Sequence, residues 1–275
     1  MRIESKLKLR ENKFIRTICY PYKNYLINYE KKEYQKKGYP ERLKNLCNSH
    51  VGDRCFIIGN GPSLTVNDLE RLEGETTFAA NRIYRLYDQT DWRPTFWLCV
   101  DPYILENDQK IISGLEGTKL ISYHAKKLGV ESSETTYFIF NYQPYRINKY
   151  SAKIKVEFSE DISKYFVAGE TVTYNSIQLA VYMGYKEIYL IGVDHSYSQS
   201  VDSSGKLCID KSIKDYFGNI KTECFNIQNS VVSTAAYISA YNYCLQNGIK
   251  VFNATRGGKL EVFPRVSLDD ILGKP

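Results

Sequence analysis

A strand, a glycine turn and a helix are predicted in direct succession at residues 54–72, and this succession constrains the fold more than any other feature. The apolar run Phe56–Ile58 stops at a tight Gly-Asn-Gly-Pro-Ser turn, residues 59–63. Thr65 follows as a predicted N-cap with Asp68 three residues further on, so we expect a helix to begin there. In α/β proteins this succession brings backbone N–H groups to a phosphate.

The turn residues can serve ligand binding directly. Gly59 and Gly61 permit close approach and positive φ angles. Asn60 and Ser63, with Pro62 between the second glycine and the serine, add side-chain groups that can hydrogen-bond a nucleotide or a sugar. The alternative is an ordinary connection between a strand and a helix. The pattern is neither a Walker A loop nor a dinucleotide fingerprint, because it lacks both the third glycine and a Gly-Lys-Ser/Thr sequence.

From residue 54 onward, short apolar runs alternate with segments of helical periodicity. This alternation is typical of α/β proteins that have a mostly parallel sheet with helices on both faces. The predicted strands are Cys55–Ile58, Thr77–Ala80, Thr95–Val100, Lys119–Ser122, Tyr137–Phe140, Glu187–Ile191 and Lys250–Phe252. The predicted helices are Val66–Leu72, Ile83–Tyr87, Ile104–Leu115, Thr173–Met183 and Val231–Asn247. Residues 196–229 lack such periodicity, and we expect a substrate lid or a surface insertion there.

The positive charge is concentrated in residues 1–50, which hold 13 Lys+Arg against 5 Asp+Glu, whereas residues 51–275 hold 24 against 26. This basic segment is predicted to be helical, with a second basic helix from Glu41 to Asn48. We expect it to lie on an anionic membrane surface, to pack on the body or on another subunit, or to remain solvated. The catalytic domain, residues 51–275, is close to neutral, which argues against nucleic-acid binding.

The composition predicts a cytoplasmic protein without a membrane span. Its 43% hydrophobic and 25% charged residues are those of a soluble globular protein. No apolar run approaches the ~20 residues that cross a bilayer, and the N-terminus has no apolar region of the signal-peptide type. The seven cysteines are scattered without a Cys-x-x-Cys pair, so no zinc site is predicted.

Polar residues recur at the predicted carboxyl ends of strands, where ligands bind in open parallel sheets. Beyond the glycine turn these are Asn81, Asp101, Asp194, His195 and Asn253. An amide can hold ribose, phosphate or sugar hydroxyls, whereas a carboxylate can hold a divalent cation, bond a ribose or act as a base. His195 can exchange a proton near neutrality or serve as an ordinary structural group. One Asn or Asp after a strand is common turn chemistry, but five such strand ends indicate a shared cleft.

The long predicted helix that ends at Met183 begins beside Thr171 and Thr173, either of which can cap it. The N–H groups at that end favour an anion, so a phosphate leaving group is expected against it. Gly184 is expected to terminate the helix. The alternative is an ordinary capped core helix.

Five motifs carry a resemblance to known proteins: Gly59–Leu64, Ala80–Arg82, Met183–Asp194, Asn253–Thr255 and Lys259–Pro264. Together they resemble the hydroxymethylpterin diphosphokinase MptE-like family. The chain is also similar to one family of bacterial sialyltransferases, which share the Asn-Gly-Pro-Ser turn and the Gly-Tyr-Lys-Glu-Ile-Tyr-Leu strand. The resemblance covers residues 51–265 and implies a Rossmann-like fold.

The two families imply different chemistry. The diphosphokinases move pyrophosphate from ATP with Mg²⁺, which would make Asp101 and Asp194 metal ligands. The sialyltransferases move sialic acid from a CMP donor without a metal. Asn60 and Asn81 match the asparagines that lie at the nucleotide-sugar of those enzymes.

The chain departs from the sialyltransferase pattern at two places. The donor-binding Thr-Ser of that family would fall at Thr171-Val172, so the serine is absent. The general base of that family is a histidine in the lid region, and no histidine follows His195 here. A sialyl-transfer mechanism therefore requires His195 or a carboxylate in place of that base.

We therefore expect a glycosyltransferase that moves a sugar, sialic acid or a similar one, from a nucleotide-activated donor to a cell-surface glycan or lipid-linked acceptor. His195, Asp194 or Asp101 would deprotonate the acceptor hydroxyl, and no metal would be required. The alternatives are an ATP- and Mg²⁺-dependent diphosphokinase of the MptE type and a non-catalytic binding protein on the same fold.

The expected location is the cytoplasm or the inner face of the membrane, with a homo-oligomer as one expected state. The residues expected to hold the donor are Gly59, Asn60, Gly61, Pro62, Ser63, Asn81, Thr171, Thr173 and Asn253.

Overall fold

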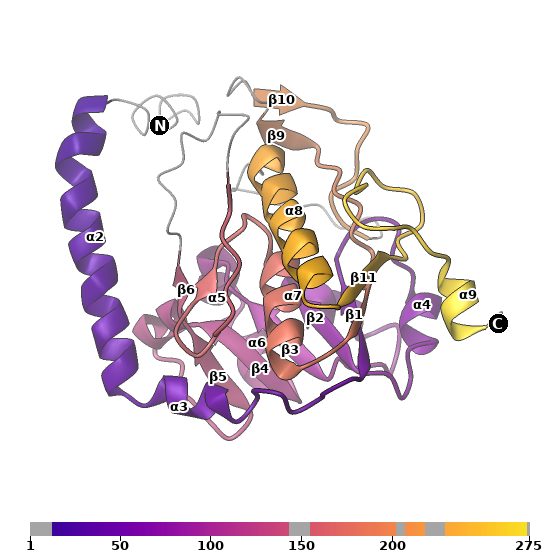
Figure 1. Ribbon diagram of the computed structural model, residues 1–275, viewed down its shortest axis with the longest axis horizontal. Coiled ribbons are helices and arrows are strands. Elements are labelled where there is room, and N and C mark those ends of the chain that lie inside the picture. The colour runs from indigo at the N-terminus through magenta and orange to yellow at the C-terminus, as the bar shows by residue number, and fades with distance from the viewer. Residues whose placement is uncertain (1–12, 143–154, 202–206, 218–228, 274–275) are drawn as a thin grey trace.

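The computed structural model describes residues 13–142, 155–201, 207–217 and 229–273, arranged around one central β-sheet (Figure 1). All seven predicted strands occur and form a single sheet in the order β11-β8-β1-β2-β3-β4-β5. Every neighbouring pair in this sheet is parallel. The strands are β1 (Arg54–Ile58), β2 (Thr77–Ala80), β3 (Phe96–Cys99), β4 (Thr118–Ser122), β5 (Thr136–Ile139), β8 (Glu187–Ile191) and β11 (Lys250–Asn253).

Helices cover both faces of the sheet, as predicted. The chain runs from β1 through β5 in one direction and from β8 to β11 in the other, so right-handed crossovers place the two sets of connections on opposite faces. α7 (Val172–Met183) packs on β1, β2 and β3, and α8 (Ser230–Gln246) packs on α7 and β11. Every residue of β2 and β3 is buried, which is typical of a parallel sheet covered on both sides. The fold is Rossmann-like.

The remaining helices are short, apart from the first. They are α2 (Lys13–Lys36), α3 (Tyr39–Lys44), α4 (Val66–Glu70), α5 (Pro102–Asn107), α6 (Gln109–Gly114) and α9 (Leu268–Leu272), with 3-10 turns η1 (Asn81–Leu86) and η2 (Tyr123–Leu128). A small pair of strands, β6 (Asn141–Tyr142) and β7 (Phe166–Val167), lies outside the main sheet. No helix in these described ranges has the length and apolar character that a membrane crossing requires.

The helix predicted over residues 104–115 is two helices, α5 and α6. They meet at Asp108, whose φ of −112° and ψ of 22° are not helical. The Asp108 carboxylate accepts a hydrogen bond from Arg82 Nε at 2.6 Å and another from the Tyr84 hydroxyl. These bonds hold Asp108 toward η1, and the helix breaks where they form.

The segment predicted to be irregular, residues 196–229, contains a pair of strands in its described part. β9 (Gln199–Val201) and β10 (Leu207–Ile209) pair antiparallel. Phe217 is buried, and its N–H donates to Asn60 O at 3.0 Å. This part of the segment therefore packs on the turn that follows β1, and a lid role for it remains a prediction.

The basic N-terminal segment is helical in its described part, as predicted, and its second helix packs on the body. α3 spans Tyr39–Lys44, against the predicted Glu41–Asn48, and contacts β5. Tyr34, near the end of α2, is fully buried, and its hydroxyl donates to Phe138 O at 3.2 Å. Residues 1–12 lie outside the described part of the chain.

We predict that Gly59→Ala lowers the free energy of unfolding by about 1–3 kcal/mol, the usual cost of overpacking. A Cβ at this position would lie 2.2 Å from the backbone oxygen of Gly192. Gly114→Ala is the matched control, because a Cβ there meets nothing within 4 Å, and it should leave stability within about 1 kcal/mol of wild type. Urea denaturation measures both, and equal stabilities for the two variants would contradict the close packing described here.

Candidate functional site

The strand connections run toward opposite edges of the sheet on the two sides of the boundary between β1 and β8. β1 leads to β2 on one side, whereas β8 leads to β11 on the other. In open parallel sheets a crevice forms at the carboxyl ends of two such strands, and ligands bind there. The turn after β1 and the segment after β8, residues 192–195, meet at this position.

These two segments are in direct backbone contact. Gly59 N–H donates to Ile191 O at 2.8 Å, and Gly61 N–H donates to Gly192 O at 2.9 Å. A Cβ at Gly61 would lie 1.9 Å from Asp194 Oδ2. Close approach therefore explains both turn glycines, and the positive φ that glycine also permits is not used, since neither residue is left-handed.

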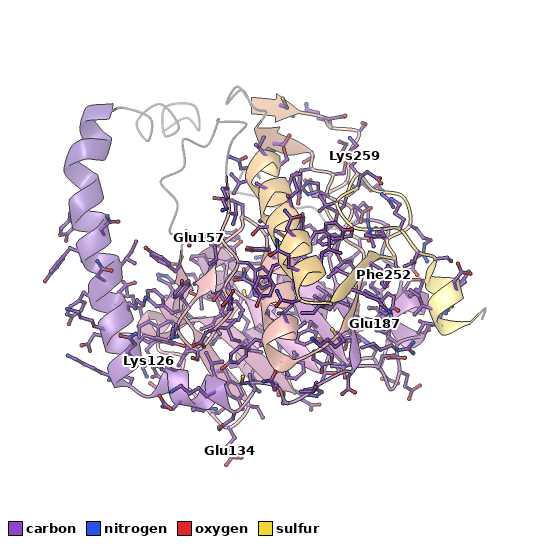
Figure 2. All side chains as sticks on the ribbon, viewed as in Figure 1. Lys126, Glu134, Glu157, Glu187, Phe252 and Lys259 are labelled. Carbon is purple, nitrogen blue, oxygen red and sulfur yellow. The ribbon has the colours of Figure 1, made fainter. Side chains whose placement is uncertain are left out.

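Asp194 lies at the centre of this contact and is 8% exposed. Its Oδ2 accepts hydrogen bonds from Ser63 Oγ at 2.7 Å and from Ser63 N at 3.5 Å. Burial raises the pKa of Asp194, although the bonds from Ser63 oppose the rise. The loop after β11, in which Figure 2 labels Lys259, holds the backbone: Lys259 N–H donates to Asp194 O at 2.7 Å. The result is a positioned carboxyl group whose proton affinity is higher than usual.

A network that sequence reasoning missed fixes the other side of the turn. Thr65 and Asp68 form the predicted capping box at the start of α4. Arg256 donates to Asp68 Oδ1 at 2.7 Å and to Ser63 O at 3.0 Å. Burial would raise the pKa of Asp68, but the bonds from Arg256 and Thr65 hold it below its usual value. No sequence pattern marks Arg256, because Asp68 lies 188 residues away along the chain.

Two asparagine side chains lie after β1 and β2 with unsatisfied carbonyl oxygens. Asn60 Nδ2 donates to Ala80 O at 2.9 Å and links the two strand ends. Asn81 has a left-handed φ of 52°, and its backbone oxygen accepts from Trp97 Nε1 at 2.9 Å. Within the described residues, Oδ1 of Asn60 and Oδ1 of Asn81 are buried without a hydrogen-bond partner. Because unpaired buried acceptors are costly, both oxygens suit hydrogen-bond donors from a ligand.

Asp101 lies apart from Asp194 along the same edge of the sheet. β3 precedes Asp101, and β1 and β2 separate β3 from β8, which amounts to about 14 Å at the usual strand spacing. Asp101 caps α5 by accepting from Tyr103 N at 2.9 Å. The structure therefore does not bring these two carboxylates together around one cation. Across the residues that are described, no three His, Cys, Asp or Glu side chains form a group that could hold a metal.

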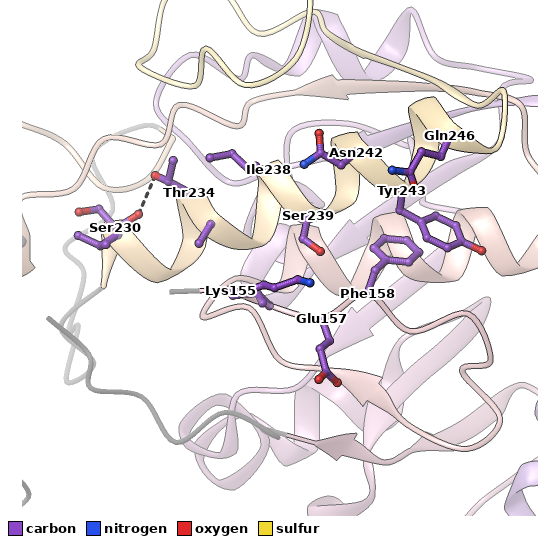
Figure 3. Close-up of a pocket in the computed structure, with 13 residues that line it drawn as sticks. Lys155, Glu157, Phe158, Ser230, Thr234, Ile238, Ser239, Asn242, Tyr243 and Gln246 are labelled. Carbon is purple, nitrogen blue, oxygen red and sulfur yellow. Dashed lines mark hydrogen bonds between the residues drawn. The ribbon is translucent and has the colours of Figure 1, made fainter. Parts of the chain in front are cut away.

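His195 directly follows Asp194 and has a left-handed φ of 51°. Its Nε2 lies 2.8 Å from Thr234 Oγ1, and the Thr234 hydroxyl donates its one proton to Ser230 O at 2.7 Å (Figure 3). Nε2 must therefore carry a proton and donate it, which leaves Nδ1 as an acceptor for Tyr197 OH at 3.4 Å. Burial lowers the pKa of His195 to about 4. A pKa this low keeps the ring neutral at pH 7, which favours the structural role of the two that the sequence left open for His195.

Tyr237 of α8 connects His195 with the start of α7. Its ring meets that of His195 edge-on, with centroids 5.5 Å apart. Its hydroxyl lies 3.2 Å from Thr171 Oγ1. Thr171 is the N-cap residue of α7, one of the two predicted positions, but its side chain makes no capping bond. Thr173 is buried inside the first turn, and Gly184 ends the helix in the left-handed conformation, as predicted.

Asn253 is buried, and its amide is used within the protein. Nδ2 donates to Leu260 O at 2.8 Å, and Oδ1 accepts from Thr255 N at 3.0 Å. Thr255 Oγ1 in turn accepts from Val193 N at 3.1 Å. We therefore assign Asn253 to the support of the segment after β8 and not to the donor. Pro62 lies exposed in the turn.

A cavity of about 910 Å³ lies along α8, against residues 155–158 (Figure 3). Phe158 and Tyr243 stack in its wall with ring centroids 4.3 Å apart. None of the predicted site residues lines it, and it reaches them through Thr234, the partner of His195. The cavity therefore lies next to the site at the carboxyl ends of β1, β2 and β8, which we call the strand-end site, and is separate from it.

Comparison with known proteins identifies one family. The family model described as 6-hydroxymethylpterin diphosphokinase MptE-like matches residues 23–200, which confirms the family expected from the motifs. The match includes the turn after β1, both asparagines and the segment after β8. None of the curated proteins matches the chain.

Two solved structures are similar at low identity. The MAf glycosyltransferase from Magnetospirillum magneticum AMB-1 is 18% identical, with a TM-score of 0.49 over 83% of this chain and 37% of that chain. The chain thus spans well under half the length of that protein. The sialyltransferase CstII from Campylobacter jejuni, in complex with the substrate analogue cytidine-5'-monophosphate, is 17% identical, with a TM-score of 0.47 over 79% of this chain and 86% of that chain. At these values neither likeness bears on the reaction.

We predict that His195 makes the protein less stable as the pH falls from 6.5 toward 4. The unfolded chain binds a proton at this ring near pH 6.5, whereas the folded protein resists it until about pH 4. The unfolded state therefore gains protons first, and up to about 3 kcal/mol of stability is lost across this window. His195→Gln keeps a donor for Thr234 and does not titrate. Urea denaturation of both proteins across the window should show a shallower pH dependence for the variant, and parallel curves would contradict the buried neutral ring.

Proposed function

The chain belongs to the 6-hydroxymethylpterin diphosphokinase MptE-like family, and within it we propose that this protein is a glycosyltransferase that uses a nucleotide-activated sugar. The proposed site lies at the carboxyl ends of β1, β2 and β8. The proposed acceptor is a hydroxyl group of a cell-surface glycan or of its lipid-linked precursor.

The unpartnered carbonyl oxygens of Asn60 and Asn81 carry the proposal. Both are buried and unpartnered, and they follow neighbouring strands. Two neutral acceptors at the ends of neighbouring strands suit two hydroxyl donors on one ligand, and the 2′ and 3′ hydroxyls of a ribose are such donors. A bound phosphate alone would not meet this need for donors, because a phosphate brings acceptors. We therefore propose that these amides hold the ribose of the donor nucleotide.

The start of α7 is proposed to face the leaving phosphate. α7 spans 12 residues, and its N-cap residue Thr171 leaves the first N–H groups without a side-chain cap. Helix N-termini carry a partial positive charge and bind phosphate through such groups. Charge that develops on the leaving oxygen would be stabilised there without reorganisation of the protein.

Asp194 is proposed as the general base. Its pKa is raised by burial, and its two bonds from Ser63 both end on Oδ2. In the proposed step, the acceptor hydroxyl gives its proton to Asp194 as its oxygen forms a bond to the anomeric carbon. The bond from that carbon to the phosphate oxygen breaks, and its electron pair leaves with the nucleotide. His195 is a weaker candidate, because both ring nitrogens have protein partners and the low pKa disfavours proton uptake.

The family match supports a second candidate, pyrophosphate transfer from ATP. Such a reaction uses Mg²⁺, which binds proteins through one or two carboxylates together with substrate phosphates. Asp101 and Asp194 do not fit as a shared pair, because two strands separate their positions. Asp194 alone, beside the glycine turn, fits the one-carboxylate arrangement, in which the cation would neutralise phosphate charge.

We predict that a nucleoside monophosphate or nucleotide-sugar raises the melting temperature without Mg²⁺. CMP, UDP, GDP and ATP, each with and without Mg²⁺, are compared by thermal shift. The proposal expects Asn60→Ala and Asn81→Ala each to weaken binding of the stabilising nucleotide about tenfold, the usual worth of one buried hydrogen bond. Asn107→Ala, an exposed asparagine on α5, is the control. Stabilisation only by ATP with Mg²⁺ would favour the diphosphokinase, and no shift with any nucleotide would favour a non-catalytic binding protein.

We predict that Asp194→Asn lowers turnover of the nucleotide-sugar by about 10²–10⁴-fold, the usual contribution of a general base. Nucleotide affinity should change little, since the asparagine oxygen can still accept from Ser63. Asp101→Asn should keep most of its activity, because asparagine also caps a helix. Release of the nucleotide measures turnover. Full activity in Asp194→Asn would remove this residue from the mechanism.

A further inference from the structure

Helix α2 has one face that anchors it to the body. Ile27 is half-buried against the core, and Tyr34 is fully buried. Lys31 lies on the same side, with Nζ 4.8 Å from the ring centroid of Tyr165 and 5.8 Å from that of Tyr142. These contacts fix the rotation of the helix about its axis and so decide which residues face outward.

The opposite face of α2 is aromatic and has no partner among the described residues. Tyr22, Tyr25, Leu26 and Tyr29 are 66%, 65%, 39% and 54% exposed. Their spacing places them within an arc of about 100° around the helix. We call these four residues the aromatic face of α2. In Figures 1 and 2, α2 stands at one side of the molecule, with side chains directed away from the body.

The charge around this face distinguishes between its possible occupants. Lys32 and Lys36 flank the aromatic face, where Lys36 pairs with Glu33 at 3.4 Å. α2 as a whole contains six Lys or Arg and two Glu, and residues 1–50 hold 13 Lys+Arg against 5 Asp+Glu. Pairing of two copies through this helix would bring like charges together, which is unfavourable. An anionic lipid surface has the complementary charge. Tyrosine also suits the membrane interface, where its ring meets apolar chains and its hydroxyl meets water.

We propose that the aromatic face of α2 docks on an anionic bilayer surface, with the helix lying in the plane of the interface. The tyrosine rings and Leu26 enter the boundary between headgroups and acyl chains, and the flanking lysines contact lipid phosphates. The contacts of Tyr34, Ile27 and Lys31 join α2 to the body and so hold the body next to the membrane. This inference does not depend on which reaction the strand-end site performs.

Vesicle co-sedimentation of the full chain tests the proposal. The wild type should bind vesicles of phosphatidylglycerol and phosphatidylcholine, should bind pure phosphatidylcholine much more weakly, and should dissociate as salt is raised. The triple variant Tyr22→Ser/Tyr25→Ser/Tyr29→Ser should bind at least about tenfold more weakly. Ile111→Ser/Leu245→Ser is the matched control, since it removes exposed apolar side chains elsewhere, 50% and 65% exposed, and should bind as the wild type does.

A second variant keeps the test decisive if the triple variant loses helix content by circular dichroism. Lys32→Glu/Lys36→Glu alters two exposed lysines of α2 and should abolish the preference for anionic vesicles. Equal binding of the wild type to both vesicle types, or unchanged binding of the variants, would overturn the proposal. A wild-type dimer in sedimentation velocity that becomes a monomer in the triple variant would assign the face to a second copy instead. Nucleotide binding is measured alongside, so that failure at the membrane is distinguished from failure of the proposed reaction.

Discussion

The close contact between the turn after β1 and the segment after β8 is the constraint on which the rest of the site depends. Two backbone hydrogen bonds, from Gly59 and Gly61, join the segments at 2.8 and 2.9 Å. The space that a Cβ would occupy at Gly61 is taken by the Asp194 carboxylate. Any side chain there would push the turn after β1 away from the segment after β8, at the point where the strand connections change direction. The glycines are therefore required by the protein itself before any ligand is considered.

This contact divides the site into two parts with different chemistry. On the β2 side, the side-chain carbonyl oxygens of Asn60 and Asn81 are neutral acceptors that have no hydrogen-bond partner within the described residues. On the α7 and α8 side, His195 is neutral and surrounded by Tyr197, Tyr237 and Thr234. Asp194 directly precedes His195, accepts from Ser63 of the turn after β1, and has the raised pKa. A reaction in which Asn60 and Asn81 bind a ribose and Asp194 removes a proton would fit this arrangement. Such a reaction needs one carboxylate and not two.

Sequence reasoning succeeded where the signal is local. The seven strands follow from apolar runs, and the capping box of Thr65 and Asp68 follows from residue spacing. It failed where distant residues decide the outcome. The break at Asp108 arises from bonds to η1, and the low pKa of His195 arises from burial under α8. Arg256 carries no pattern of its own, yet it holds both Ser63 and Asp68.

By itself, the sequence determined the order of elements, the glycine turn, the family and the set of polar strand ends, because periodicity, caps and turn chemistry act over a few residues. Only the tertiary structure decided which strand ends are neighbours. Strand order placed Asp194 beside the turn after β1 and left Asp101 two strands beyond it. Strand order depends on crossovers and long-range packing, which no short stretch of sequence encodes. Burial, likewise a property of the assembled core, then raised the pKa of Asp194 and lowered that of His195.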